Sequence, residues 1–134
     1  MSCLQILVQS FSFRKGLPAD ETGHGGGYVF DCRAITNPGR FPEFSQVTGK
    51  DASVVDFLER GGEVQPFLSH VFALADFHVA RFVERGFTSL TFSFGCTGGQ
   101  HRSVYCAEQL AKHITDIFPS VQVEIRHNER ENWP

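Results

Sequence analysis

The chain has 134 residues, of which 41% are hydrophobic, and a formal net charge of −3. This length suits a single domain that buries roughly two-thirds of its unfolded surface. The charge excludes a strongly basic nucleic-acid-binding domain, and no apolar run reaches the ~20 residues of a membrane span. The four cysteines lack CxxC and zinc spacing, which indicates free thiols in a reducing compartment. We expect one cytoplasmic domain over residues 1–134, with no metal and no cofactor.

The first quarter of the chain predicts two strands joined by a loop. Residues 4–13 are largely apolar and end in a clean alternation of Ser and Phe, which is typical of a strand. Residues 28–33 predict a second, shorter strand. The four glycines between residues 19 and 27 indicate a flexible connection.

Charged and turn-forming residues follow the second strand. Asp31 and Arg33 lie two residues apart and therefore on one face, next to a turn that contains Asn37 and Arg40. Two interpretations stay open here. Asp31 and Arg33 pair only with each other, or Arg33, Asn37 or Arg40 contributes to an anion site.

Two helices are predicted in the middle of the chain. Residues 48–51 match a capping box that opens a helix as far as Leu58, and two glycines at positions 61 and 62 end it. Apolar residues from Val64 to Phe82 then recur at helical spacing and predict a second helix that ends near Gly86.

The third predicted unit is a strand, a glycine-rich turn and a helix. Residues 88–94 alternate β-branched, aromatic and small side chains, and apolar residues from Val104 to Ile117 recur at helical spacing before Pro119. Residues 95–103 connect the two and are named the glycine loop below. Such a turn directs main-chain N–H groups and the positive end of a helix at one point.

Two basic residues in this loop favour an anionic ligand. His101 and Arg102 lie at the start of the predicted helix, where the dipole disfavours cations by a few tenths to about 1 kcal/mol. A charge-assisted hydrogen bond to a bound anion contributes about 1.5–3 kcal/mol and would outweigh that cost. The alternative is an ordinary turn with a solvated arginine.

The chain closes with a predicted strand over residues 121–125 and a polar tail. Arg126 and His127 follow this strand, at the carboxyl edge where open parallel sheets bind ligands. The element order predicts an α/β fold, a small, mostly parallel four-stranded sheet with helices packed on its faces.

The glycine loop also fits the C-x5-R-S signature of cysteine-dependent phosphatases, from Cys96 to Arg102 and Ser103. In that case a Cys96 thiolate would attack phosphorus, Arg102 would hold the phosphate oxygens, and Asp20 or Asp31 would be the general acid. The family usually has a histidine before the cysteine, whereas this chain has Gly95.

Motifs along nearly the whole chain resemble the C-terminal domain of the RNase adapter protein RapZ family. The most specific of them is the decapeptide GCTGGQHRSV at residues 95–104. Others are SFRKGLP at 12–18, FDCR at 30–33, TGKD at 48–51 and the pair Arg126-His127.

The resemblance implies a phosphofructokinase-subdomain-like fold and a non-catalytic sensor of a phosphorylated amino sugar such as glucosamine-6-phosphate. It implies a phosphate cradle made by Thr97, Gly98, Gly99, Gln100, His101, Arg102 and Ser103. It also places Asp31, Arg33 and Asn37 on the sugar side, where Arg40, Arg126 and His127 are further candidates for contacts with the anion.

The resemblance further implies RNA binding and self-association, and related sequences suggest a fused or associated kinase or nucleotidyltransferase partner. This chain contains no P-loop, has Gly39 and Arg40 where the family has a histidine, and ends in an acidic tail instead of a basic one. An RNA-binding adapter is therefore the first alternative to the sugar-phosphate module, and a phosphatase is the second.

Overall fold

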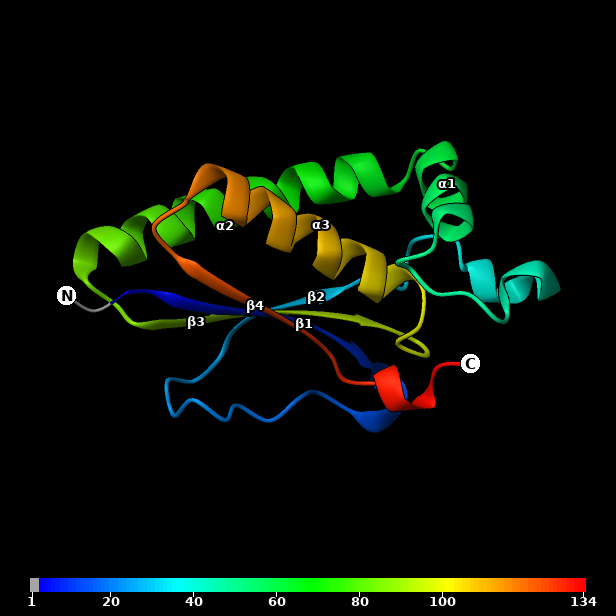
Figure 1. Ribbon diagram of the computed structural model, residues 1–134, viewed down its shortest axis with the longest axis horizontal. Coiled ribbons are helices and arrows are strands. Elements are labelled where there is room, and N and C mark those ends of the chain that lie inside the picture. Colours follow the sequence, from blue (N-terminus) through cyan, green and yellow to red (C-terminus); the bar gives the residue numbers. More distant parts are fainter. Residues whose placement is uncertain (1–2) are drawn as a thin grey trace.

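Four strands form one sheet in the computed structural model, which describes residues 3–134 (Figure 1). The strands are β1 (Gln5–Ser12), β2 (Gly27–Asp31), β3 (Ser89–Cys96) and β4 (Gln122–His127). They lie in the order β2-β3-β1-β4, and every neighbouring pair is parallel. The predicted α/β fold with a small four-stranded sheet is confirmed.

Three helices accompany the sheet: α1 (Ala52–Arg60), α2 (Val64–Arg85) and α3 (Arg102–Ile117). Gly86 ends α2 in the left-handed region, with φ of 74°, as its position after the last apolar residue predicted. The capping box differs from the prediction. Asp51 is the N-cap of α1, but its carboxylate accepts from Thr48 N and Oγ1 instead of from the helix, so it closes the preceding turn.

The core lies between the sheet and the helices. Alternate residues of the two central strands, among them Ile6, Val8, Leu90 and Phe92, are at most 1% exposed. α3 packs on β1, β3 and β4, and α2 packs against α3. Leu110 and Ile114 of α3 are fully buried in the resulting cluster. Within residues 3–134, no helix is both long enough and apolar enough to cross a membrane.

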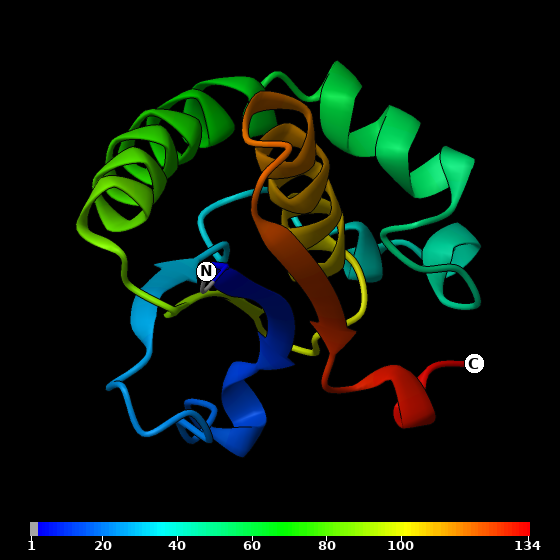
Figure 2. The same cartoon turned by 60° about the vertical axis from the view of Figure 1, so that its left-hand side comes forward.

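All three helices lie on one side of the sheet, although the sequence suggested helices on both (Figures 1 and 2). The topology explains this placement. Parallel crossover connections share one hand, so connections that move in opposite directions across a sheet lie on opposite faces. Those from β2 to β3 and from β3 to β4 move one way and contain the helices, whereas the one from β1 to β2 moves the other way.

The connection from β1 to β2 therefore crosses the face without helices, named the open face below. It begins with a short 3-10 helix, Phe13–Lys15, and continues as residues 16–26, named the covering segment. Figure 2 shows it as the blue loop beneath the sheet. Asp20 organises this segment locally, because its carboxylate accepts from Thr22 N, Thr22 Oγ1 and Gly25 N.

Candidate functional site

The glycine loop leaves β3 at the point where connections diverge toward opposite faces. β1 and β3 are neighbours, and the chain leaves β1 toward the open face but leaves β3 toward α3. In parallel α/β sheets, such a divergence opens a crevice at the carboxyl ends of the two strands, which is the usual ligand site. Ser12 and Cys96 mark that edge, where they are partners in the parallel register.

Two polar side chains of the loop are engaged with the protein. Gln100 Nε2 donates to the carbonyls of Ser45 and Val47 at 3.1 and 2.9 Å. His101 is 7% exposed, and its Nε2 lies 2.8 Å from the carbonyl oxygen of Phe44. These side chains thus anchor the segment that precedes α1 to the loop.

Arg102 is a buried cation at the first position of α3, 4% exposed. Its Nη1 donates to the carbonyls of Arg33 and Ile35 at 3.0 and 2.8 Å, and Nη2 lies 3.4 Å from Thr97 Oγ1. Its Nε is buried and has no hydrogen-bond partner among residues 3–134. Leaving such a donor unpaired costs about 1–3 kcal/mol, or more for a charged group.

Main-chain amides complete the loop's donors. Within the described residues, the N–H groups of Gly98, Gly99, Gln100 and His101 donate no hydrogen bond to the protein. They belong to the turn before α3 and to its N-terminal end, where the helix dipole favours negative charge. Gly98 is exposed, whereas Gly99 is buried with φ of 72°.

Cys96 and Ser103 face inward. Cys96 is 3% exposed and Ser103 is fully buried, and Cys96 Sγ lies 3.1 Å from Ser103 Oγ. A nucleophile must reach its substrate, and this thiol is packed beneath the loop instead.

The residues that follow β2 lie beside the loop. Cys32 N donates to Gly95 O, and Arg33 O accepts from Arg102. Asp31 and Arg33 form a bidentate ion pair, with a shortest distance of 2.7 Å, and the Arg33 guanidinium stacks 3.8 Å above the Phe13 ring. Hydrogen bonding to Arg33 lowers the pKa of Asp31, and the nearby charge of Arg102 lowers it further.

The turn after this pair is oriented by its own hydrogen bond. Asn37 Oδ1 accepts from Gly39 N and caps the 3-10 helix Pro38–Arg40, which packs toward α1. Arg40 is exposed in that helix.

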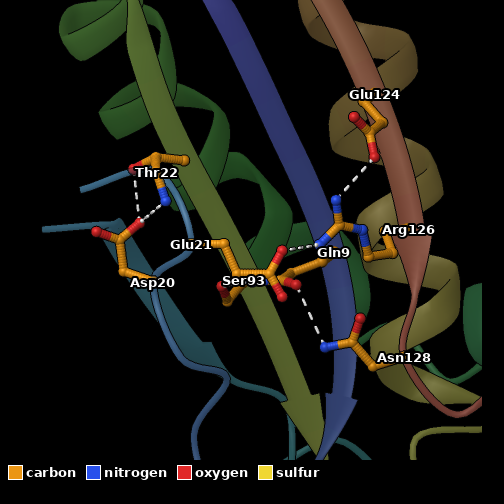
Figure 3. A network of polar contacts seen from close by, with 8 residues as sticks. All are labelled: Gln9, Asp20, Glu21, Thr22, Ser93, Glu124, Arg126 and Asn128. Carbon is orange, nitrogen blue, oxygen red and sulfur yellow. Dashed lines mark hydrogen bonds and ion pairs between the residues drawn. The ribbon is translucent and has the colours of Figure 1, made fainter. Parts of the chain in front are cut away.

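Arg126 and His127 lie at the opposite edge of the sheet from Asp31 and Arg33. β4 and β2 are the two edge strands, so three strand spacings, about 14 Å, separate them. Arg126 pairs with Glu21 and Glu124 on the open face, as Figure 3 shows. His127 points the other way and contacts Ser10 and Glu108 of α3. One small ligand cannot span both edges.

Two residues of the predicted polar tail pack against the loop. Trp133 Nε1 donates to Gly99 O at 3.0 Å, and Glu129 is only 9% exposed, with Lys15 Nζ 3.5 Å from its carboxylate. This contact was not predicted from the sequence. The one tryptophan of the chain lies in an otherwise charged tail, and a large aromatic residue there could have indicated that the tail packs on the domain. Among residues 3–134, no group of three or more His, Cys, Asp or Glu side chains could hold a metal ion.

Comparisons with known proteins agree with the motifs. The sequence model of the RapZ C-terminal domain matches residues 4–131. A nucleotide-binding protein of Actinobacillus pleuropneumoniae serotype 5b (strain L20) is 40% identical over 129 residues, which are 96% of this chain and 43% of the relative. One from Acidithiobacillus ferrooxidans (strain ATCC 53993) is 42% identical over 128 residues, 96% of this chain and 40% of the relative.

This chain thus spans about two-fifths of the length of these relatives. The family match nevertheless extends through all four strands and all three helices. The chain belongs to the RapZ C-terminal domain family.

Proposed function

We propose that this chain is a non-catalytic module that binds a phosphorylated sugar, such as glucosamine-6-phosphate, at the glycine loop. The observation that carries the proposal is the donor set at the start of α3. The amides of residues 98–101 donate to no protein group in the described chain, and the guanidinium of Arg102 adds a positive charge at the same turn. A phosphate group offers several acceptor oxygens, which match such a set.

The sugar would extend toward the end of β2. Asp31, Arg33 and Asn37 come from the segment that runs beside the glycine loop. Like an ordinary aspartate, Asp31 is ionised at neutral pH, and hydrogen bonding to Arg33 lowers its pKa further. An ionised carboxylate accepts hydrogen bonds from sugar hydroxyls or from an amino group. Arg40 is a candidate for a peripheral contact, whereas the far edge with Arg126 and His127 lies outside the reach of the same small ligand.

The geometry favours binding over phosphate transfer. Cys96 is buried against Ser103, and neither candidate acid suits proton donation. Hydrogen bonding to Arg33 lowers the pKa of Asp31, and hydrogen bonding to Thr22 lowers that of Asp20. A general acid must be protonated at the working pH, and these carboxyl groups are not.

RNA is the first alternative ligand, since the resemblance to an RNase adapter family implies RNA binding. RNA affinity rests mainly on lysine and arginine side chains that neutralise phosphates. Here Lys15, Arg33 and Arg126 are already engaged in ion pairs with carboxylates. This charge pairing, together with the net charge of −3, weakens the case for RNA.

The relatives' names refer to a nucleotide, which also presents phosphate. Because those proteins are more than twice as long as the matched region, their nucleotide need not bind to the matched part. A nucleotide therefore belongs in the test as a competing ligand.

Isothermal titration calorimetry with glucosamine-6-phosphate, glucosamine, inorganic phosphate and AMP tests the proposal. We expect glucosamine-6-phosphate to bind most tightly, inorganic phosphate weakly, and glucosamine not measurably. A Gly98→Val variant should weaken binding at least about tenfold, because the side chain would cover the free amides. Gly98 suits this test because it is exposed, has no positive φ, and a Cβ there meets no atom within 4 Å.

The matched control is Gly61→Ala, at a helix end where a Cβ makes only ordinary contacts of 3.4 Å or more. It should bind as the unaltered protein does. Equal binding of glucosamine-6-phosphate by Gly98→Val and Gly61→Ala would overturn the assignment of the loop. Tighter binding of AMP, or of a structured RNA titrated in the same way, would replace the sugar phosphate as the ligand.

A further inference from the structure

The open face of the sheet carries a cavity that the glycine loop does not share. Its volume is about 850 Å³, within the range of small-molecule sites. The sheet forms its floor, the covering segment forms one wall, and the residues after β4 form another. None of residues 95–103 lines it.

The floor is built from residues in register across the strands. Ser93 of β3 pairs with Gln9 of β1, and Gln9 in turn pairs with Arg126 of β4. The preceding row contributes Thr91 and Leu7. Figure 3 shows Gln9, Ser93, Arg126 and Asn128 gathered on this side, with Glu21 of the covering segment next to them.

These side chains of the central strands are polar although they are buried. Gln9 is 5%, Thr91 is 6% and Ser93 is 4% exposed. On the helix-covered face, the neighbouring positions are apolar, such as Val8 and Phe92. Burying an amide or a hydroxyl costs free energy unless it is hydrogen-bonded. If the only role of these side chains were to pack beneath the covering segment, we would expect apolar residues here as well.

The hydrogen bonds among these groups leave capacity for a ligand. Gln9 Nε2 donates to Ser93 Oγ at 2.9 Å, and Asn128 Nδ2 donates to Gln9 Oε1 at 3.2 Å. The Ser93 hydroxyl thus keeps its proton to donate, and each amide nitrogen keeps a second proton. Asn128 Oδ1 and Thr91 Oγ1 make no side-chain hydrogen bond in the described chain, so acceptors remain as well.

The charges of the cavity argue against an anion. Arg126 is bracketed by Glu21 and Glu124 at 3.3 and 3.1 Å, which compensates its charge. The lining has three acidic residues, Asp20, Glu21 and Glu131, and two arginines, Arg126 and Arg130. Mixed donors and acceptors without excess positive charge suit a neutral polar ligand.

An aromatic wall separates the cavity from the glycine loop. Phe11 and Phe13 pack edge to face at 4.9 Å, and a Cβ at Gly95 would meet both rings at 2.5 Å. The two rings therefore cover the open face at the carboxyl end of β3, over Gly95. A ligand in the cavity and an anion at the loop would occupy separate sites.

We propose that the open-face cavity is a second binding site, which takes a small, uncharged, polyhydroxylated molecule of the neutral monosaccharide or polyol class. Gln9, Ser93 and Asn128 would exchange hydrogen bonds with its hydroxyl groups, and Leu7 and Leu17 would contact its carbon skeleton. The ion pair between Arg126 and Glu21 links the covering segment to β4 beside the site.

Nuclear magnetic resonance on the uniformly 15N-labelled protein tests this site directly. The probes are glucose, N-acetylglucosamine and myo-inositol, each titrated to about 50 mM, since unphosphorylated ligands of this size bind weakly. We expect at least one probe to shift the side-chain amide signals of Gln9 and Asn128 saturably. Inorganic phosphate should leave these two signals in place.

Ser93→Ala should weaken the binding of that probe at least about fivefold, while Ser69→Ala, at an exposed position on α2, should leave it unchanged. Gln9→Met preserves side-chain length, removes the amide, and should abolish binding. Absence of saturable shifts with all three probes would overturn the proposal. So would shifts of the Gln9 and Asn128 signals by phosphate, or unchanged affinity in Ser93→Ala.

Discussion

The glycine loop and the open-face cavity use polar residues in opposite ways. At the loop, the conspicuous side chains Gln100, His101 and Arg102 are engaged with carbonyl oxygens of distant segments, and mainly backbone amides are left over. In the cavity, the side chains contact one another and retain free donors and acceptors. A motif rich in polar residues can thus be largely structural, while a less conspicuous row in a strand forms a potential site.

The largest expected effect is the loss of stability when the buried hydrogen bonds of the loop are removed. Arg102→Ala would leave the carbonyls of Arg33 and Ile35 without their buried partner, so we expect a loss of about 3–5 kcal/mol in the free energy of unfolding. Urea denaturation measures this loss. Arg60→Ala, which removes an exposed pair on α1, should cost less than about 1 kcal/mol. Equal effects of the two substitutions would show that the buried bonds of Arg102 contribute little.

A glycine pair tests how tightly the loop is packed. Gly99→Ala should destabilise the protein by about 2–3 kcal/mol, because φ is 72° and the new Cβ would lie 2.7 Å from Glu129 Cγ. Gly86→Ala shares the positive φ, at 74° in the left-handed region, but meets no atom within 4 Å, so strain alone should cost about 1 kcal/mol. Thermal denaturation of both variants separates the steric contribution from the conformational one. A Gly99→Ala variant no less stable than Gly86→Ala would contradict the packing.

The docking of the C-terminal residues on the loop is expected to be weaker. Trp133→Phe keeps an aromatic ring but removes the donor to Gly99 O, with an expected loss of about 1 kcal/mol. The amide signals of Gly99 and Gln100 should move in the same variant. If they stay in place, Trp133 does not dock on the loop in solution.

The smallest effect concerns pH and the helix-covered side of β4. Burial lowers the pKa of His127 below its ordinary value of 6.5, against a smaller opposing effect of Glu108. As pH falls through 6.5, the unfolded chain takes up the proton before the folded chain does, so folding stability decreases. Urea denaturation at pH 7.5 and 5.5 should show a smaller decrease for His127→Gln than for the unaltered protein. Identical decreases would mean that His127 does not contribute to the pH dependence.

Sequence periodicity was sufficient to predict the strands and helices. The ends of α2 and α3 follow from Gly86 and Pro119, and the apolar alternation of β1 and β3 defines the central strands. The single-sided placement of the helices was not predictable in this way, since it depends on the order β2-β3-β1-β4. Nothing local in the sequence sets that order.

The sequence predicted the turn that carries the candidate site, but not the tertiary contacts of its residues. The glycines and Arg102 correctly indicated a turn at the start of a helix. That His101 contacts Phe44, 57 residues earlier, depends on tertiary contacts that no local pattern reveals. Similarly, Asp31 and Arg33 form the ion pair that was one of two open interpretations, while Arg126 and His127 lie at the far edge. Gln9 and Ser93 could have been found as polar interruptions of apolar strands.

We propose that the free amides of the glycine loop capture a phosphate group. Titration of 15N-labelled protein with glucosamine-6-phosphate, followed by backbone amide shifts, tests it most directly. We expect the largest saturable shifts at Gly98, Gly99, Gln100 and His101, and we expect glucosamine without phosphate not to produce them. Absence of shifts in these four amides, with saturation elsewhere in the chain, would contradict it.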